Sequence, residues 1–398
     1  MATSSVDRPL IRRPAPSVPR VDGERLIFAD VLRVAIVAMV IVHHAAQAYG
    51  PTGGVWPVED EVTSDWFLPF YTANAAVGLG LLFLLAGYFT GRSYDRKGAG
   101  RFLRERWGRI GVPLVVFVLG VHLPLAYLVE GLPAPDDLVR SLYEDGWQGI
   151  YLHLWFLGHV LLYSAVHVAW RRYTQRTGRP RRPWSPPGHA AIATYVFALI
   201  LLTWIVRWWF PVDEWVPLLL VMPVEPANLL QYVSLFALGA VAYRNDWFRR
   251  MPTRSGIVWL AVGLVAVLGI YLMEPLGLWY DPRAIGGFTW QSLARTSWEA
   301  LVTAGLSVGL VVSFRELFRR PRRLLTAMAA GSYAAFILHL YIVIGLQIAI
   351  LGWDLPVFVK FALVSVLGVL LSFGMAHLSR RVPGVRAVLG TRPRSQRT

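Results

Sequence analysis

The stretch LRVAIVAMVIVHH, which runs from Leu32 to His44, decides the fold of this chain. Apart from Arg33 near its start and two histidines at its end, every residue in it is apolar. Such a run is typical of a helix that crosses a lipid bilayer, which needs about 20 mostly apolar residues. Because ionisable side chains inside such a helix cost free energy, Arg33 and His44 call for a functional explanation.

Similar apolar runs recur along all 398 residues, of which 55% are hydrophobic and 16% charged. Soluble domains carry about a quarter charged residues, so a membrane protein is expected. We predict ten membrane-spanning helices, near residues 26–49, 66–90, 110–129, 151–170, 189–209, 220–243, 256–273, 292–314, 326–351 and 356–378. The sequence thus predicts an all-α, polytopic integral membrane protein with one transmembrane domain over residues 26–379.

Basic residues fill the two ends of the chain and every second loop, whereas the alternate loops are acidic or nearly neutral. By the positive-inside rule, we expect both termini in the cytoplasm and the chain in the cell membrane. Residues 1–25 are polar and Pro-rich, which predicts a disordered basic tail, and residues 380–398 predict a second basic tail. The net charge of +15 then reflects topology and attraction to anionic lipid or an anionic cosubstrate, and no nucleic-acid partner is expected.

The residue types present limit the available chemistry. The chain has no cysteine, which excludes disulfides and a thiolate nucleophile. His43 and His44 diverge on a helix, and no His-Glu-x-x-His or comparable ligand spacing occurs. We therefore expect no metal site.

The first helix carries the sharpest polar pattern. Arg33 and His44 are eleven residues apart, so they share one helix face with a rise of about 16 Å between them. Asp30 falls near the same stripe and is placed to pair with Arg33. We expect Arg33 and His44 to face a common cavity. The alternative is that Arg33 snorkels to one interface and His44 lies among headgroups at the other.

Polar residues on later helices are candidates for substrate binding. His153 and Trp155 open the fourth helix, in YLHLWFLGH, and Ser332 and His339 share a face of the ninth helix because they are seven residues apart. Glu225 begins the sixth helix, in VEPANLLQY. Each has a simpler alternative: a solvated histidine for His153, an interfacial belt residue for Trp155, an interhelical hydrogen bond for His339, and a loop-to-helix start for Glu225.

Several stretches together resemble the acyltransferase 3 family of multi-pass membrane acyltransferases, which includes O-antigen acetyltransferases and a glucan-modifying branch. The family's opening motif, an arginine and a histidine separated by ten residues, maps onto Arg33 and His44 after Asp30. LLFLLAGYFTGRSYDRKGAGRFLRERWGRIGVPLVV, HLWFL, LFALGAVAYRNDWF and AAGSYAAFILHLYIV are also similar to family stretches, in the family's order. One departure is Ala86, where many members have serine.

The resemblance implies transfer of an acyl group, acetyl or succinyl, from acyl-CoA as cosubstrate to a hydroxyl of a carbohydrate, glycolipid or small molecule, with no permanently bound cofactor. Arg101, Arg104, Arg106 and Arg109 are then phosphate partners for CoA, although topology alone also accounts for them. A histidine is mostly neutral and basic at pH 7, so His44 is the expected general base, with Arg33 holding the donor.

Two rival interpretations remain open at this stage. A transporter would use the same intramembrane residues to bind substrate or relay protons, but the sequence shows no matching inverted halves. A purely structural membrane scaffold does not explain the cost of placing Arg33 in the bilayer. Direct transfer and a covalent acyl-enzyme intermediate are equally compatible with the residues present.

Overall fold

The computed structural model describes residues 26–51, 56–129, 134–144, 147–177, 183–273 and 281–389. The predicted tail over residues 1–25 lies outside the described residues, as do residues 390–398 of the second tail. Helices make up most of the described chain, and one short antiparallel hairpin is the β-structure found in these ranges. The predicted all-α class is confirmed.

The first half of the chain contributes both long and short helices. These are α1 (Ile27–Ala46), α2 (Phe67–Lys97), α3 (Ala99–Arg106), α4 (Val112–Phe117), α5 (Leu123–Val129), α6 (Pro135–Glu144), α7 (Gln148–Tyr151), α8 (Trp155–Arg176) and α9 (His189–Val206). π-Helical turns at Trp107–Gly111 and Val118–His122 join α3, α4 and α5 into one continuous rod. A rod of this kind satisfies its own backbone hydrogen bonds, as a lipid environment requires.

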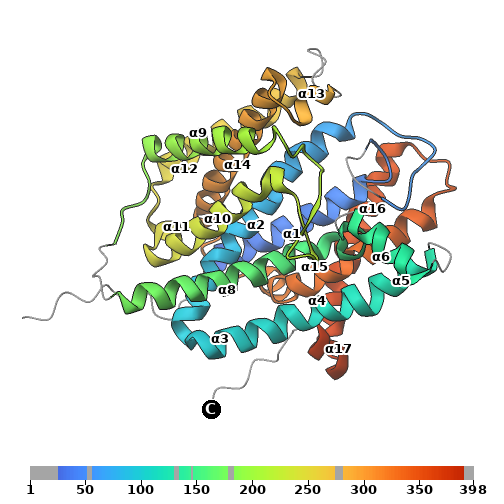
Figure 1. Cartoon of the computed structure of the whole chain (residues 1–398), viewed down its shortest axis with the longest axis horizontal. Coiled ribbons are helices and arrows are strands. Elements are labelled where there is room, and N and C mark those ends of the chain that lie inside the picture. Colours follow the sequence, from blue (N-terminus) through green and yellow to red (C-terminus); the bar gives the residue numbers. More distant parts are fainter. Residues whose placement is uncertain are drawn as a thin grey trace, which may run out of the picture.

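The second half starts with the hairpin. Strands β1 (Val216–Leu218) and β2 (Met222–Val224) pair in antiparallel register, with Val216 opposite Val224. The helices that follow are α10 (Pro226–Arg244), α11 (Trp247–Arg250), α12 (Thr253–Gly269), α13 (Pro282–Ile285), α14 (Trp290–Leu317), α15 (Arg323–Ile350), α16 (Val357–Ser379) and α17 (Pro383–Val388). Figure 1 shows α9 and α12 beside α14, and α3 and α4 along the opposite edge with α8.

Nine helical segments in the described ranges are long and apolar enough to cross a membrane. They cover residues 27–46, 67–97, 99–128, 148–176, 189–206, 253–272, 290–317, 323–350 and 357–379. The sixth predicted segment, 220–243, is helical only from Pro226, because the residues before it form the hairpin. Its helix α10 also carries the polar Asn228, Gln231 and Ser234, and it is not among the nine.

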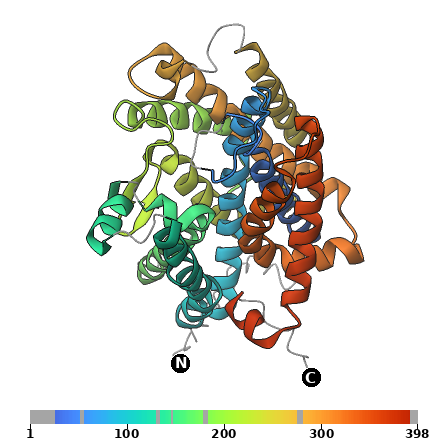
Figure 2. The ribbon, with the colours of Figure 1, turned by 90° about the vertical axis from the view of Figure 1, so that its right-hand side faces the viewer.

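Helix α1 lies at the centre of the bundle, against α2, α15 and α16. It runs parallel to α15, since Arg33 contacts Ser332 in the first turns of α15 and Ala45 contacts Gln347 near its end. Figure 2 shows the long helices roughly upright, with α17 at their lower end. We name this the basic end, because Arg33 and the cationic residues that close α2 lie toward it.

Helices α2 and α10 approach each other unusually closely through two glycines. A Cβ atom on Gly87 would lie 1.9 Å from the Phe236 carbonyl oxygen, and one on Gly239 would lie 2.0 Å from the Leu84 carbonyl oxygen. Only hydrogen fits at either position. Small residues at helix interfaces in membranes allow this backbone contact, which is how the bundle gains packing energy without a hydrophobic driving force.

The end of the bundle opposite the basic end is fastened by a buried ion pair. Lys360 of α16 donates to both carboxylate oxygens of Asp60, at 2.8 and 3.1 Å, and to the Leu351 carbonyl at 3.2 Å. The two side chains are 4% and 2% exposed. Asp60 belongs to the loop between α1 and α2, so this ion pair fixes that loop over the end of α1.

Candidate active site

Arg33 is held on α1 by the start of α15. Its Nε donates to Ser332 Oγ at 3.0 Å, and its Nη2 donates to the Ala329 carbonyl at 2.9 Å and to Asp30 at 3.1 Å. The guanidinium also lies 5.7 Å from the centre of the Phe89 ring. The predicted pairing with Asp30 is confirmed, and the guanidinium also contacts groups of α2 and α15.

A cavity of about 560 Å³ lies beside Arg33, between α1, α2, the α3–α4 rod, α8 and α15. Its half toward the basic end is charged, with Arg92, Arg96, Lys97, Arg106, Arg109, Asp30 and Glu105 in its lining. Its inner half is apolar, with Val37, Leu82, Leu85, Phe156, Leu157, Val160 and Phe336. The cavity is therefore polarised, cationic near the basic end and apolar deep in the bundle.

Two of the four arginines predicted to contact CoA line this cavity, and the structure places the other two elsewhere. Arg106 and Arg109 are lining residues. Arg106 donates to Thr90, and its Nε has no hydrogen-bond partner among the described residues. Arg101 is 74% exposed and pairs with Glu105, and Arg104 is exposed on α3. Neither of the last two contributes to the lining.

His44 belongs to a second cluster, further along α1. Its ring centre lies 5.0 Å from that of His339 on α15, and the His339 ring lies 4.8 Å from that of His153, just before α8. Three histidines predicted independently from the sequence therefore meet at one place. His122 continues the row, with its ring 6.5 Å from His153 and its Nε2 2.5 Å from the Tyr341 hydroxyl.

The neighbours of His44 determine which of its ring nitrogens is basic. His44 Nδ1 lies 2.8 Å from the Val40 carbonyl, which only accepts, so Nδ1 carries the proton. By the same reasoning, His339 Nδ1 donates to the Phe336 carbonyl at 2.6 Å, and its Nε2 is left as an acceptor 3.3 Å from His44 Nδ1. The tautomer that satisfies both contacts leaves the lone pair of neutral His44 on Nε2.

Sequence reasoning missed the groups that surround His44 on the far side of the cluster. The Trp56 ring lies 5.5 Å from the His44 ring, and its Nε1 donates to Gln347 Oε1 at 2.9 Å. Gln347 Nε2 in turn donates to the carbonyls of His44 and Ala45, both at 3.1 Å. The sequence could have pointed to Gln347, because it is a polar residue inside an apolar helix. It could not have pointed to Trp56, because the position of that side chain depends on how the loop folds back.

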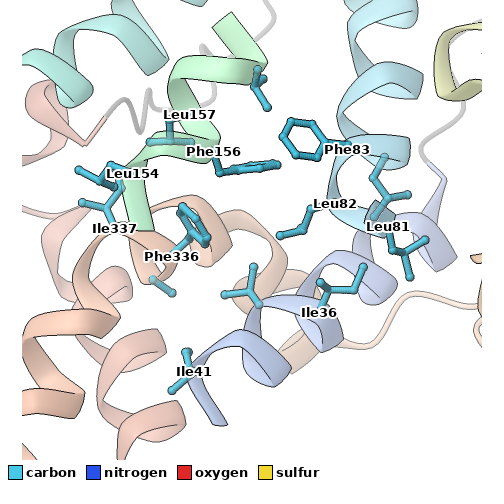
Figure 3. Packing of buried hydrophobic residues seen from close by; sticks show 14 of the residues in the cluster. Ile36, Ile41, Leu81, Leu82, Phe83, Leu154, Phe156, Leu157, Phe336 and Ile337 are labelled. Atoms are coloured by element: carbon cyan, nitrogen blue, oxygen red, sulfur yellow. The ribbon is translucent and has the colours of Figure 1, made fainter. Parts of the chain in front are cut away.

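The cavity and the histidine cluster are neighbours, not one space. Among the described residues, the cavity lining contains Arg33 and Val37 but not His44, which is about 10 Å further along α1. The expected common cavity is therefore wrong in this conformation. Figure 3 shows Phe336 of α15 and Phe156 of α8 close together on the inner side of the cavity. The shared helix face of Arg33 and His44 is confirmed, because both contact α15.

The remaining predicted substrate residues lie in different places. Ser332 accepts a hydrogen bond from Arg33 and lines the cavity. Its neighbour Tyr333 also lines the cavity. Trp155 points away from the histidine cluster, with its ring 5.2 Å from Trp215 and 5.6 Å from Tyr232. Glu225 accepts a hydrogen bond from the Asp213 backbone at 3.1 Å, beside a separate polar cluster in which Arg207 pairs with Glu299. The structure does not bring these last two to His44.

Comparison with known proteins identifies a family for this chain. A family model described as an acyltransferase domain matches residues 26–377. The chain belongs to the acyltransferase 3 family. The match spans the described transmembrane bundle, including Arg33, His44 and both sides of the cavity. The predicted family is thus confirmed, together with a multi-pass membrane architecture.

Relatives within the family carry a common name. The chain is 25% identical over 272 residues to "Glucans biosynthesis protein C" of Salmonella heidelberg, a match covering 62% of this chain and 67% of the relative. The protein of that name from Salmonella schwarzengrund is 25% identical over 276 residues, with the same coverage. In Salmonella dublin the match is 25% over 170 residues, covering 40% of this chain and 44% of the relative. No solved structure matches.

Proposed function

We propose that this member of the acyltransferase 3 family transfers an acyl group, acetyl or succinyl, from cytoplasmic acyl-CoA to a hydroxyl group at the opposite face of the cell membrane. The main support for this proposal is the polarised cavity, which is cationic toward the basic end and apolar within. Arg33 lines this cavity, and His44 lies further along the same helix. The positive-inside rule supports placing the basic end in the cytoplasm, where acyl-CoA is made available.

The donor half of the proposal assigns roles to the cavity. CoA carries several phosphate charges, and Arg106, Arg109 and Arg92 present guanidinium groups suited to bind them. The pantetheine arm and acyl group then lie against the apolar inner half. Arg33, fixed by Ser332 and the Ala329 carbonyl, lies beside this arm at the boundary between the two halves.

The chemical half of the proposal uses His44 as general base. Its Nε2 takes the proton from the acceptor hydroxyl, whose oxygen attacks the thioester carbonyl. The carbon–sulfur bond breaks, and CoA leaves as a thiolate that is then protonated. The products are an ester and free CoA. His339 positions the base, since its Nε2 lies 3.3 Å from the Nδ1 of His44. The printed names of the relatives support a glucan hydroxyl as the first acceptor to test.

The test is acyl-CoA consumption by the purified protein in detergent. With labelled acetyl-CoA and a glucan acceptor, we expect label on the acceptor and one free thiol released per ester formed. The thiol is measured with a chromogenic disulfide reagent, which is uncomplicated here because the chain has no cysteine. A transporter consumes no thioester, so absence of acceptor-dependent thiol release with every acceptor class, including glycolipid and small-molecule hydroxyls, would refute the proposal.

A further inference from the structure

Three apolar side chains from three different helices line the inner half of the cavity. Leu82 of α2, Phe156 of α8 and Phe336 of α15 all line it, and they are 7%, 8% and 5% exposed. We call these three residues the inner wall. The rings of Phe156 and Phe336 are 5.7 Å apart, and Phe83 supports Phe156 from behind at 4.7 Å. Figure 3 shows the inner wall between the helices that carry it.

The inner wall is one aromatic ring thick on the side of the histidines. The Phe336 ring faces the cavity and also lies 5.4 Å from the His153 ring and 5.7 Å from the His339 ring. His339 in turn contacts His44. Phe336 therefore touches both the cavity and the histidine cluster that contains His44.

The polarity of the cavity determines which part of the donor meets this wall. Arg92 and Leu82 are both lining residues of α2, ten positions and therefore about 15 Å apart along the helix. Phosphate groups bind at the arginine level, since burying them among apolar side chains would leave them without partners. The opposite end of the donor, which is the acyl group, then lies against Leu82, Phe156 and Phe336.

The composition of the wall also selects against charge. A carboxylate at the end of an acyl group would lie among apolar side chains, and an unpaired buried charge is strongly unfavourable. Three cations face this part of the cavity. The Arg33 guanidinium already binds Asp30, Ser332 and the Ala329 carbonyl, and the proposal assigns Arg106 and Arg109 to the phosphates of the donor. A neutral acyl group meets no such penalty.

We infer that the inner wall of Leu82, Phe156 and Phe336 restricts the donor to a short, uncharged acyl group, with Phe336 as the residue that sets the size limit. This inference rests on the proposed function, because it takes the cavity as the acyl-CoA site. It chooses between the two acyl groups of that proposal: acetyl is accepted, and succinyl is rejected.

The experiment compares acetyl-, hexanoyl- and succinyl-CoA as donors for the wild type and for Phe336→Ala and Phe336→Leu. Wild type is expected to prefer acetyl-CoA over both others by tenfold or more in kcat/KM, a ratio within the range that pocket size supplies. In Phe336→Ala the hexanoyl-to-acetyl ratio should rise by about tenfold, with a smaller rise in Phe336→Leu. Succinyl-CoA should remain poor in both variants, because neither adds a cation.

Phe314→Ala is the matched control for lost packing. Phe314 lies in α14, contacts the main hydrophobic core and does not line the cavity. Its variant should keep the wild-type donor ratios even if its thermal stability falls. Unchanged ratios in both Phe336 variants, or equal use of succinyl- and acetyl-CoA by the wild type, would overturn the inference while leaving acyl transfer intact. If the wild type releases CoA from no donor, the proposed function itself fails, and this inference fails with it.

Discussion

The substitution His44→Asn tests the proposed chemistry most directly. The asparagine side-chain amide can occupy the position of His44 Nδ1, so it keeps a donor near the Val40 carbonyl and the His339 Nε2 atom. It has no counterpart of the basic Nε2. The variant therefore removes the proton acceptor while retaining the hydrogen bond to His339 that joins α1 to α15.

The expected loss follows from what a general base contributes. A positioned base supplies a factor of about 10² to 10⁴ in rate, which corresponds to about 3 to 5 kcal/mol in the activation barrier. We expect kcat to fall by that factor in the thiol-release assay. Donor binding should be unchanged within about threefold, because His44 does not line the cavity that we assign to acyl-CoA. CoA binding is measured separately by isothermal titration calorimetry.

The neighbouring histidine provides the control. His43 points to another side of α1, with its ring 5.6 Å from Tyr71 and its Nε2 3.4 Å from the Gln47 amide nitrogen. His43→Asn should keep kcat within about threefold of wild type. The assignment of His44 as base is refuted if His44→Asn retains more than a tenth of the wild-type rate, or if the two variants lose activity equally.

Two further predictions concern the bundle that holds the site. Gly239→Ala should destabilise the protein by about 1 to 3 kcal/mol, because its new Cβ would overlap the Leu84 carbonyl oxygen and push α10 from α2. Gly345→Ala has open space around its new Cβ and should leave the protein's stability unchanged or slightly higher. Equal melting temperatures for the two variants in detergent would contradict the packing argument. Asp60→Asn should lower the free energy of unfolding by about 3 to 5 kcal/mol, because it leaves the Lys360 ammonium buried without its carboxylate. The double variant Asp60→Leu with Lys360→Met should recover most of that stability. A single variant that melts like the wild type would show that the ion pair does not fasten the loop.

The membrane-spanning helices could be predicted because the signal is local. Each predicted apolar segment overlaps a helix of the structure, since spanning a bilayer depends on the length and composition of one stretch. The segment at 220–243 differs in structure at its start. Its first residues pair as a hairpin before Pro226, a contact between two neighbouring runs that hydropathy does not register.

The sequence by itself also determined that Arg33 and His44 share a helix face, because the period of an α-helix fixes side-chain direction once the helix is assigned. It identified His153, Ser332 and His339 as polar residues in apolar surroundings. The pairing of Arg33 with Ser332 and the meeting of His44 with His339 were decided by the parallel packing of α1 on α15. His153 joins them because the turn before α8 lies against α15. The packing of α1 on α15 joins residues about 300 positions apart in the chain. A single sequence does not show which residues of two such distant helices lie side by side.

Only the tertiary structure separated the donor cavity from the histidines. Phe336 is an unremarkable apolar residue in the sequence, indistinguishable from the lipid-facing side chains around it. Its place between the cavity and His339 results from how α8 packs beside α15. Trp56 lies beside His44 because the loop between α1 and α2 folds back over the end of α1. The periodicity of one helix fixes which residues point the same way, whereas what they point at is set by the helices that pack against it.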